Sequence, residues 1–143
     1  MTRTVLITGA AGNIGTKLRA HFSSLGCTLR LLDSNAHGDA AIQAADLAEW
    51  DDAWVEQFAG VDTVIHLAGN PSPRTSWESA QRLNIDLTAN VFEAAAAHGV
   101  QRVVFASSNW VMAGHRPGQG VLTPIWSRIR SIHTACRNWW ASG

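Results

Sequence analysis

The chain has 143 residues, with no tyrosine and a single lysine, Lys17, although it carries seven tryptophans. Its acidic and basic residues balance to a net charge of zero, so the charge favours neither nucleic acid nor an anionic membrane as a partner. No apolar run reaches the length of a membrane-spanning helix, and the N-terminus shows no signal-peptide pattern. We therefore expect one domain with one core, located in the cytoplasm.

Cysteine is scarce as well. Cys27 and Cys136 match no metal-binding or redox spacing, so we expect reduced thiols and no metal site.

The first stretch with a clear pattern runs from residue 4 to residue 26. The apolar run 5–7 ends at a glycine, which is typical of a strand buried on both faces. The period then changes to that of a helix that ends near Gly26. The apolar stripe predicted for this helix consists of Ile14, Leu18, Phe22 and Leu25.

Three glycines lie between this strand and this helix. Gly9 permits a tight turn, Gly12 permits close approach of a pyrophosphate, and Gly15 permits close packing of helix on strand. The phosphates would then lie on the free N–H groups at the positive end of the helix. A loop that merely needs glycine is the alternative, but strand and helix are both present, so we predict dinucleotide binding.

Asp33 ends a second apolar run, 27–32, and lies 18 positions after Gly15. A carboxylate at this place accepts hydrogen bonds from the hydroxyls of the adenosine ribose and repels a 2′-phosphate. No arginine follows closely, so NAD is predicted rather than NADP. A solvated aspartate after a strand is the alternative.

Strand and helix patterns alternate from residue 4 to residue 109. Strands are predicted at 4–8, 27–32, 42–45, 61–67 and 103–106, and helices at 14–25, 49–58 and 75–98. Trp50, Trp54 and Phe58 form an aromatic stripe that indicates core packing, and Thr75 with Glu78 forms a capping box. The fold class predicted is α/β, a doubly wound parallel sheet of the Rossmann type with strand order 3-2-1-4-5, incomplete at the C-terminus.

Several segments together resemble the extended short-chain dehydrogenase/reductase family, which includes nucleotide-sugar epimerases and dehydratases. The matching segments are 8–15, with its Gly-x-x-Gly-x-x-Gly spacing, Asp33, Asp46 and Leu47, 66–69, Asn84 and 105–109. Segments 94–100 and 103–109 look most like uronate dehydrogenases, which oxidise a hexuronic acid with NAD. Trp110 stands where those enzymes usually carry histidine.

The resemblance implies NAD as cofactor and a sugar or uronic acid as substrate. The implied cofactor-binding residues are Gly9, Gly12, Asn13, Ile14, Gly15, Asp33, Asp46, Leu47, Leu67, Ala68, Gly69 and Asn84. Within this set, residues 9–15 hold the pyrophosphate and Asp33 the ribose. Asp46 and Leu47 line the adenine pocket, and residues 67–69 pass under the nicotinamide half. Ser108 matches the catalytic serine, and Ser72, Ser107 and Asn109 would touch substrate, although a pair of serines can also be a plain polar strand end.

The family also uses a tyrosine as general acid or base and a lysine four residues later, which lowers the tyrosine pKa. This chain has no tyrosine, and Lys17 lies in the first predicted helix, so the pair is absent. His115 and His133 are possible substitutes, but nothing in the sequence fixes them near Ser108.

The sequence after residue 120 follows no pattern of the family. Back-translation of 125–143 in a shifted frame permits a Tyr-x-x-x-Lys motif at the expected distance from Ser108, and Asn138-Trp139-Trp140-Ala141 then forces Leu-Val-Gly. We therefore expect a partial NAD-binding domain at 1–120 and an aberrant or disordered tail at 121–143, the product of a frameshift. A genuine tail is the alternative, and the chain would then be a non-enzymatic NAD-binding or interaction module, with self-association through an open sheet edge also possible.

Overall fold

The computed structural model describes residues 2–108, and the five strands within them form one parallel sheet. The strand order is β3-β2-β1-β4-β5, as the sequence predicts. The strands are β1 Thr4–Thr8, β2 Thr28–Asp33, β3 Ile42–Ala44, β4 Thr63–His66 and β5 Arg102–Phe105. The chain therefore has the doubly wound α/β fold that the alternating pattern indicates.

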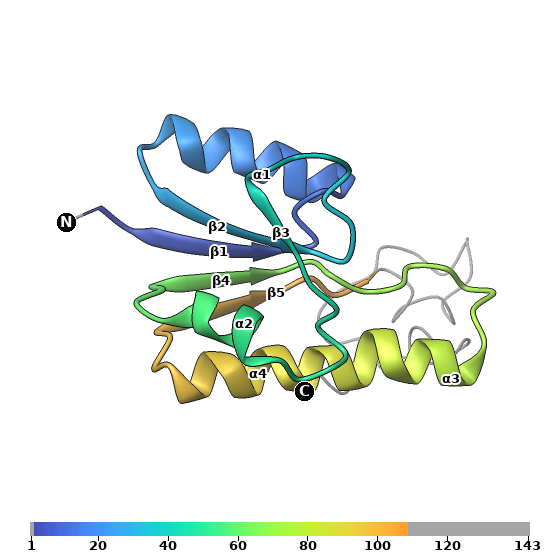
Figure 1. The fold of residues 1–143 in the computed structure, drawn as a ribbon. Helices are drawn as coiled ribbons and strands as arrows, with labels where there is room; N and C mark the ends of the chain where they lie inside the picture. Colours follow the sequence, from blue (N-terminus) through green and yellow to red (C-terminus); the bar gives the residue numbers. More distant parts are fainter. Residues whose placement is uncertain (1, 109–143) are drawn as a thin grey trace, which may run out of the picture.

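Helices cover both faces of the sheet (Figure 1). Helix α1, Asn13–Ser24, lies on one face, and the remaining helices lie on the other. Those are α2 Asp52–Val55, the 3₁₀ turn η1 Glu56–Phe58, α3 Trp77–Ala80, the π-helical segment η2 Gln81–Asp86 and α4 Leu87–Ala97. Figure 1 shows α3, η2 and α4 as one long helix along the sheet. None of the helices in residues 2–108 is both long and apolar enough to cross a bilayer.

The core has one layer on each side of the sheet, because successive strand residues point to opposite faces. Val5 and Ile7 belong to the cluster under α1, where Leu18 and Phe22 also pack. Leu6 belongs to the opposite cluster, which contains the fully buried Trp54 and Phe58. The central strand is thus buried on both sides, as its continuous apolar run indicates.

Three predictions about the helices are wrong near the helix ends. The helix predicted from residue 49 begins at Asp52, because the side chain of Asp51 caps it by accepting the Ala53 N–H at 2.8 Å. Trp50 therefore lies outside the helix and is 46% exposed, although its ring packs edge-on against Trp54.

The second error concerns the start of the long helix. Ser76, not Thr75, is the N-cap, since the Ser76 hydroxyl accepts the Ser79 N–H at 3.2 Å. The Thr75 hydroxyl instead accepts a hydrogen bond from Asn70 Nδ2 at 3.0 Å. In α1, only the middle of the predicted stripe packs on the core, while Ile14 and Leu25 are exposed.

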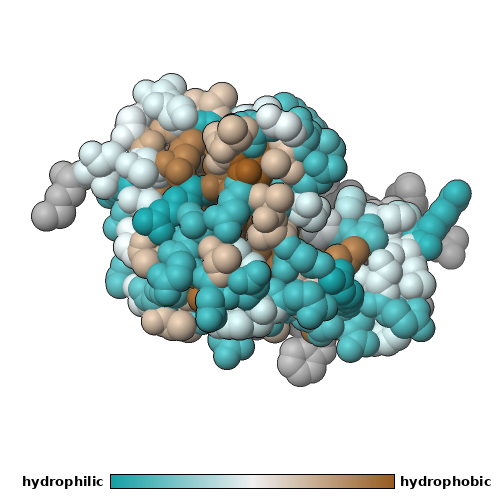
Figure 2. Space-filling model, viewed as in Figure 1, coloured by the Kyte–Doolittle hydropathy of each residue, from teal (hydrophilic) through white to brown (hydrophobic). Residues whose placement is uncertain are grey.

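The face shown in Figure 2 is mainly hydrophilic, with a small group of apolar residues exposed beside α1 and β3. The edge strand β3 has only three residues, and a short edge strand offers little backbone for pairing with another chain.

Candidate nucleotide-binding site

The C-terminal ends of β1, β2 and β4 meet at one edge of the sheet, where open parallel sheets bind their ligands (Figure 1). β1 leads into the glycine loop, β2 ends at Asp33, and β4 leads into Leu67, Ala68 and Gly69. The fold therefore brings together three of the sequence segments predicted to bind the cofactor.

Two glycines are required by the packing of the loop itself. Gly9 has a φ of +70°, and a Cβ there would lie 2.8 Å from the Ala68 backbone nitrogen. A Cβ at Gly15 would lie 2.3 Å from the Gly9 carbonyl oxygen, which no side chain can tolerate. Because these two residues have no Cβ, the backbones of β1, the start of α1 and the loop after β4 can lie close together at the site.

Gly12 is the N-cap of α1 and has an extended φ of −71° that other residues also adopt. Among the described residues no side chain caps this helix end, and its first turn contains no acidic residue. Gly12, Asn13 and Ile14 are exposed there. The N–H groups at this positive helix end are therefore not capped by any side chain in residues 2–108 and are open to an anion.

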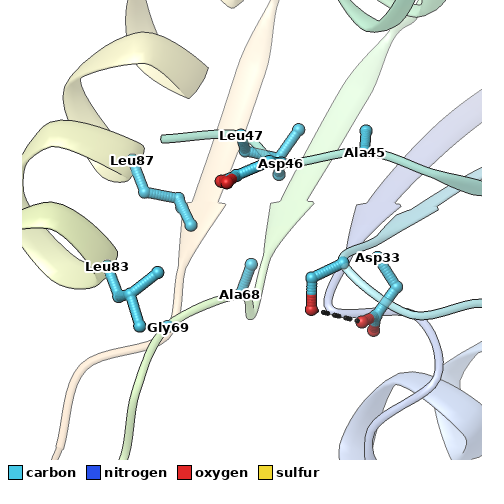
Figure 3. Close-up of a pocket in the computed structure, with 9 residues that line it drawn as sticks. Asp33, Ala45, Asp46, Leu47, Ala68, Gly69, Leu83 and Leu87 are labelled. Atoms are coloured by element: carbon cyan, nitrogen blue, oxygen red, sulfur yellow. Dashed lines mark hydrogen bonds between the residues drawn. The ribbon is translucent and has the colours of Figure 1, made fainter. Parts of the chain in front are cut away.

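Asp33 lies beside this helix end and is half-buried. Its Oδ2 accepts the Ala11 N–H at 2.9 Å, and its Oδ1 accepts the Asn35 N–H at 3.2 Å. The Ser34 hydroxyl also donates to Oδ1 at 3.4 Å (Figure 3). A carboxylate has about four acceptor sites, so besides these three bonds about one site remains for a ribose hydroxyl while the carboxylate stays anchored to the glycine loop.

A pocket of about 160 Å³ lies next to Asp33 (Figure 3). It is lined by Asp33, Ser34, Ala45, Asp46, Leu47, Ala68, Gly69, Leu83 and Leu87. Pockets for drug-sized ligands have roughly 300–1,000 Å³, so this one fits part of a dinucleotide. Five of its residues are among those predicted for the cofactor. The other four, Ser34, Ala45, Leu83 and Leu87, are not among the residues that the sequence predicts for the site.

Asp46 is held at the rim of this pocket from two sides. Its Oδ1 accepts the Ala48 N–H at 3.1 Å, and Arg82 of η2 donates to Oδ2. The hydrogen bond from Arg82 lowers the pKa of the Asp46 carboxyl, so the carboxylate is ionised at neutral pH. The neighbouring Leu47 is buried, and its carbonyl accepts a bond from Asn90 Nδ2 at 3.0 Å.

Below the strand ends lies a buried polar chain that the sequence did not single out. The Thr8 hydroxyl accepts the N–H groups of Leu67 and Ala68, both at 3.2 Å, so its own proton points to His66 Nδ1 at 2.6 Å. His66 Nε2–H then donates to the Thr88 hydroxyl at 3.2 Å. Burial lowers the pKa of His66 from 6.5 to about 4, so the ring is neutral at pH 7. The chain fixes the backbone of residues 67–68 against β1.

The loop after β4 contains the substrate candidate Ser72, which is exposed, and its N–H donates to Asn70 Oδ1 at 2.9 Å. The other candidates follow β5: Ser107 is exposed, Ser108 is half-buried, and Asn109 lies outside the described residues, as do His115 and His133.

Asn84, predicted to bind the cofactor, is 8% exposed. The oxygen and the nitrogen of its side-chain amide both form hydrogen bonds with the backbone of Asn70. A contact between Asn84 and the cofactor stays a prediction.

Residues 5–129 match the sequence profile described as the NAD dependent epimerase/dehydratase family. L-arabinose 1-dehydrogenase (NAD(P)(+)) of Haloferax volcanii is 40% identical over 108 residues, which are 75% of this chain and 41% of that protein. Uronate dehydrogenase of Pseudomonas syringae pv. tomato is 37% identical over 122 residues, 82% of this chain and 44% of that protein. A solved variant of uronate dehydrogenase from Agrobacterium tumefaciens, complexed with NAD, has 31% identity and a TM-score of 0.84 over 98% of this chain and 53% of that chain. The chain thus spans about half the length of these relatives, or less.

Proposed function

The chain belongs to the NAD dependent epimerase/dehydratase family, and on that premise we propose that it is the NAD-binding part of a sugar oxidoreductase similar to uronate dehydrogenase. The observation that carries this is the packing of Gly15 against Gly9, which brings an uncapped helix end beside the anchored carboxylate of Asp33. Sugar dehydrogenases among the relatives support the substrate class. A cytoplasmic location stays a prediction from the sequence.

The described residues fit NAD in their chemistry. The N–H groups at the start of α1 would bind the pyrophosphate, and Asp33 would accept from the adenosine ribose. The end of the pocket formed by Asp46 and Leu47 would take the adenine ring, and the opposite wall, formed by Ala68 and Gly69, would face the rest of the cofactor. When bound, NAD supplies a nicotinamide ring that exchanges a hydride with the substrate carbon.

The protein's own part in the chemistry is incomplete in this proposal. Ser108, at the end of β5, would orient the substrate oxygen, as the resemblance implies. The proton of that oxygen needs a base, and this sequence has neither tyrosine nor a lysine outside α1. An unperturbed phenol has a pKa of about 10, so the family's tyrosine depends on its lysine, and this sequence contains neither that tyrosine nor a lysine besides Lys17.

We therefore expect the chain to bind NAD without oxidising a uronic acid. Turnover of glucuronate and galacturonate with NAD should lie at least about 10²-fold below that of an ordinary dehydrogenase, because loss of a general base costs about 10²–10⁴-fold. Formation of NADH, followed by absorbance, is the measurement. A rate within tenfold of a uronate dehydrogenase assayed alongside would contradict the proposal and bring His115 or His133 back as a base.

A non-enzymatic NAD-binding module is the second candidate, and the absence of tyrosine favours it. The nucleotide sequence after the codon of Gly120 separates the two. A shifted frame that encodes Tyr-x-x-x-Lys supports descent from an active enzyme through a frameshift, whereas a shifted frame without that motif supports the module.

A further inference from the structure

We propose that Asn84 is a positioning residue that holds the loop after β4 beside the nicotinamide half of the site, and that it does not contact the cofactor. This inference rests on the proposed NAD-binding function. It replaces the direct contact that the resemblance implies with a clamp between two parts of the backbone that are 14 residues apart in sequence.

The clamp consists of two hydrogen bonds to one residue. Asn84 Oδ1 accepts the Asn70 N–H at 2.7 Å, and Asn84 Nδ2 donates to the Asn70 carbonyl at 3.1 Å. The side chain is buried, so these two bonds replace water for both ends of the amide and for the backbone of Asn70. Losing them leaves the half-buried N–H and carbonyl of Asn70 without these partners and frees the loop from the helix.

Asn70 passes this constraint on to the rest of the loop. Its Oδ1 accepts the Ser72 N–H at 2.9 Å, and its Nδ2 donates to the Thr75 hydroxyl at 3.0 Å. Asn84 therefore fixes Asn70, and Asn70 fixes both the backbone at Ser72 and the residue just before the cap of α3. Ser72 is the loop residue predicted to touch the substrate.

The approach of Asn84 also explains the glycine that precedes Asn70. A Cβ at Gly69 would lie 2.9 Å from Asn84 Oδ1, so any side chain at residue 69 displaces the clamp. Gly69 and Ala68 line the pocket, and the N–H of Ala68 is held by the Thr8 hydroxyl. The stretch 68–70 is thus fixed from β1 on one side and from the long helix on the other.

The local form of the helix is consistent with this role. Asn84 lies within η2, the π-helical segment between α3 and α4. π-Helical turns are rare and recur at functional sites, where they change the direction of a side chain. Here the side chain in that segment is aimed at the loop backbone of Asn70.

The first test measures the clamp in the full chain without any nucleotide. Amide hydrogen exchange at Asn70 and Ser72 should become at least about tenfold faster in Asn84→Ala, since both hydrogen bonds that hold Asn70 to the helix are lost. Gly69→Ala should give the same change from the other side of the contact. Gln43→Ala is the matched control, because Gln43 Nε2 also donates to a backbone carbonyl, that of Ala53 at 3.0 Å, but from β3. Wild-type exchange rates at Asn70 and Ser72 in Asn84→Ala would overturn the proposal.

The second test separates positioning from general damage. Titration with NADH and with ADP compares the whole cofactor with its adenosine half. Asn84→Ala should raise the dissociation constant for NADH about tenfold and change that for ADP less than about twofold. Equal weakening of both ligands, or of neither, would overturn the proposal. Weaker NADH binding with unchanged exchange at Asn70 would instead indicate a direct contact, and would overturn it too.

If Asn84→Ala does not fold, Asn84→Asp provides the same tests. The aspartate keeps an acceptor for the Asn70 N–H but loses the donor to its carbonyl, so exchange and NADH affinity should fall between those of wild type and Gly69→Ala. Wild-type values for both would overturn the proposal. Failure of the wild-type chain to bind NADH or ADP would contradict the proposed function alone, because the exchange measurement needs no ligand.

Discussion

The site has two parts: the β1–β2 side, formed by the glycine loop and Asp33, and the β4 side, formed by residues 67–70. They differ in the sequence separation of the residues whose contacts stabilise them. On the first side, the glycine loop and Asp33 lie within 25 residues, and the key bond joins Ala11 to Asp33 across 22 positions. On the second side, residues 67 and 68 depend on Thr8, about 60 positions away, and Asn70 depends on the long helix. The first side is therefore specified by local sequence, and the second by the assembled fold.

This difference predicts which substitutions damage the whole site and which damage one side. The two sides touch at the glycine loop, where Gly9 packs against Ala68 and Gly15 packs against Gly9. Substitutions there should have the largest effect, and those at the sheet edge the smallest.

Gly15→Ala should destabilise the fold by about 3 kcal/mol, because its Cβ would meet the backbone of Gly9 and Ala10 rather than a movable side chain. NADH binding should be lost with it. Gly26→Ala is the control: Gly26 has a φ of +72° but nothing within 4 Å of a Cβ, so only backbone strain of roughly 1 kcal/mol is expected. Chemical denaturation measures both, and equal losses of stability would refute the packing role of Gly15.

Acid should lower the free energy of unfolding by protonating the buried His66 on the β4 side. The folded pKa of about 4 lies below the ordinary 6.5, so the unfolded chain binds more protons between these values. The stabilisation is complete above about pH 6.5 and is lost as the pH falls toward 4, by about 3 kcal/mol in total.

The comparison is between wild type and His66→Gln over that range. The variant should be less stable at pH 7 and should lack this part of the pH dependence, measured as the free energy of unfolding at several pH values. Parallel profiles for the two proteins would show that His66 does not titrate in this way.

Asp33→Ala should weaken NADH binding by about 2 kcal/mol, through the lost ribose contacts and the released Ala11 N–H. It should also reduce the preference for NADH over NADPH. Asp39→Ala is the matched control, since Asp39 lies on the loop after β2 and pairs with Arg19 at 2.7 Å. Fluorescence titration with both nucleotides is the measurement, and an unchanged NADH to NADPH ratio in Asp33→Ala would remove Asp33 as the selective residue.

The smallest effect is expected at β5, an edge strand of the sheet that residues 2–108 form, where Val104 is 49% exposed. If copies of the chain pair through this edge, Val104→Lys should weaken association by about 1 kcal/mol, roughly fivefold. Ala44→Lys on β3, at the opposite edge, is the control. Sedimentation at several concentrations measures the dissociation constant, and a wild-type monomer at all of them would rule the pairing out.

The sequence predicts those parts of the fold that depend on short patterns of neighbouring residues. The alternation of strand and helix patterns predicts the doubly wound parallel sheet, and the glycine spacing predicts the tight turn at Gly9 and the close packing of helix on strand at Gly15. Whether the predicted residues bind a cofactor is still a prediction, although the fold brings Asp33, Asp46 and Ala68 to one pocket.

The rest depends on contacts between distant segments, which a single sequence does not display. Helical periodicity marks the apolar face of a helix, but it does not show that Leu83 and Leu87 line a pocket. The sequence places His66 within a predicted strand, and only its hydrogen bonds to Thr8 and Thr88 show that it helps to fix the backbone of residues 67–68. The long helix is capped one residue later than the sequence predicts, because the Thr75 hydroxyl accepts a hydrogen bond from Asn70.

The central claim is that the nucleotide-binding side is complete in this chain without the acid–base pair of the family. Calorimetric titration of the full chain with NADH tests it most directly. The account predicts saturable binding at one site per chain, abolished by Gly15→Ala and weakened by Asp33→Ala. A folded wild-type chain that releases no heat of binding with millimolar NADH would contradict it.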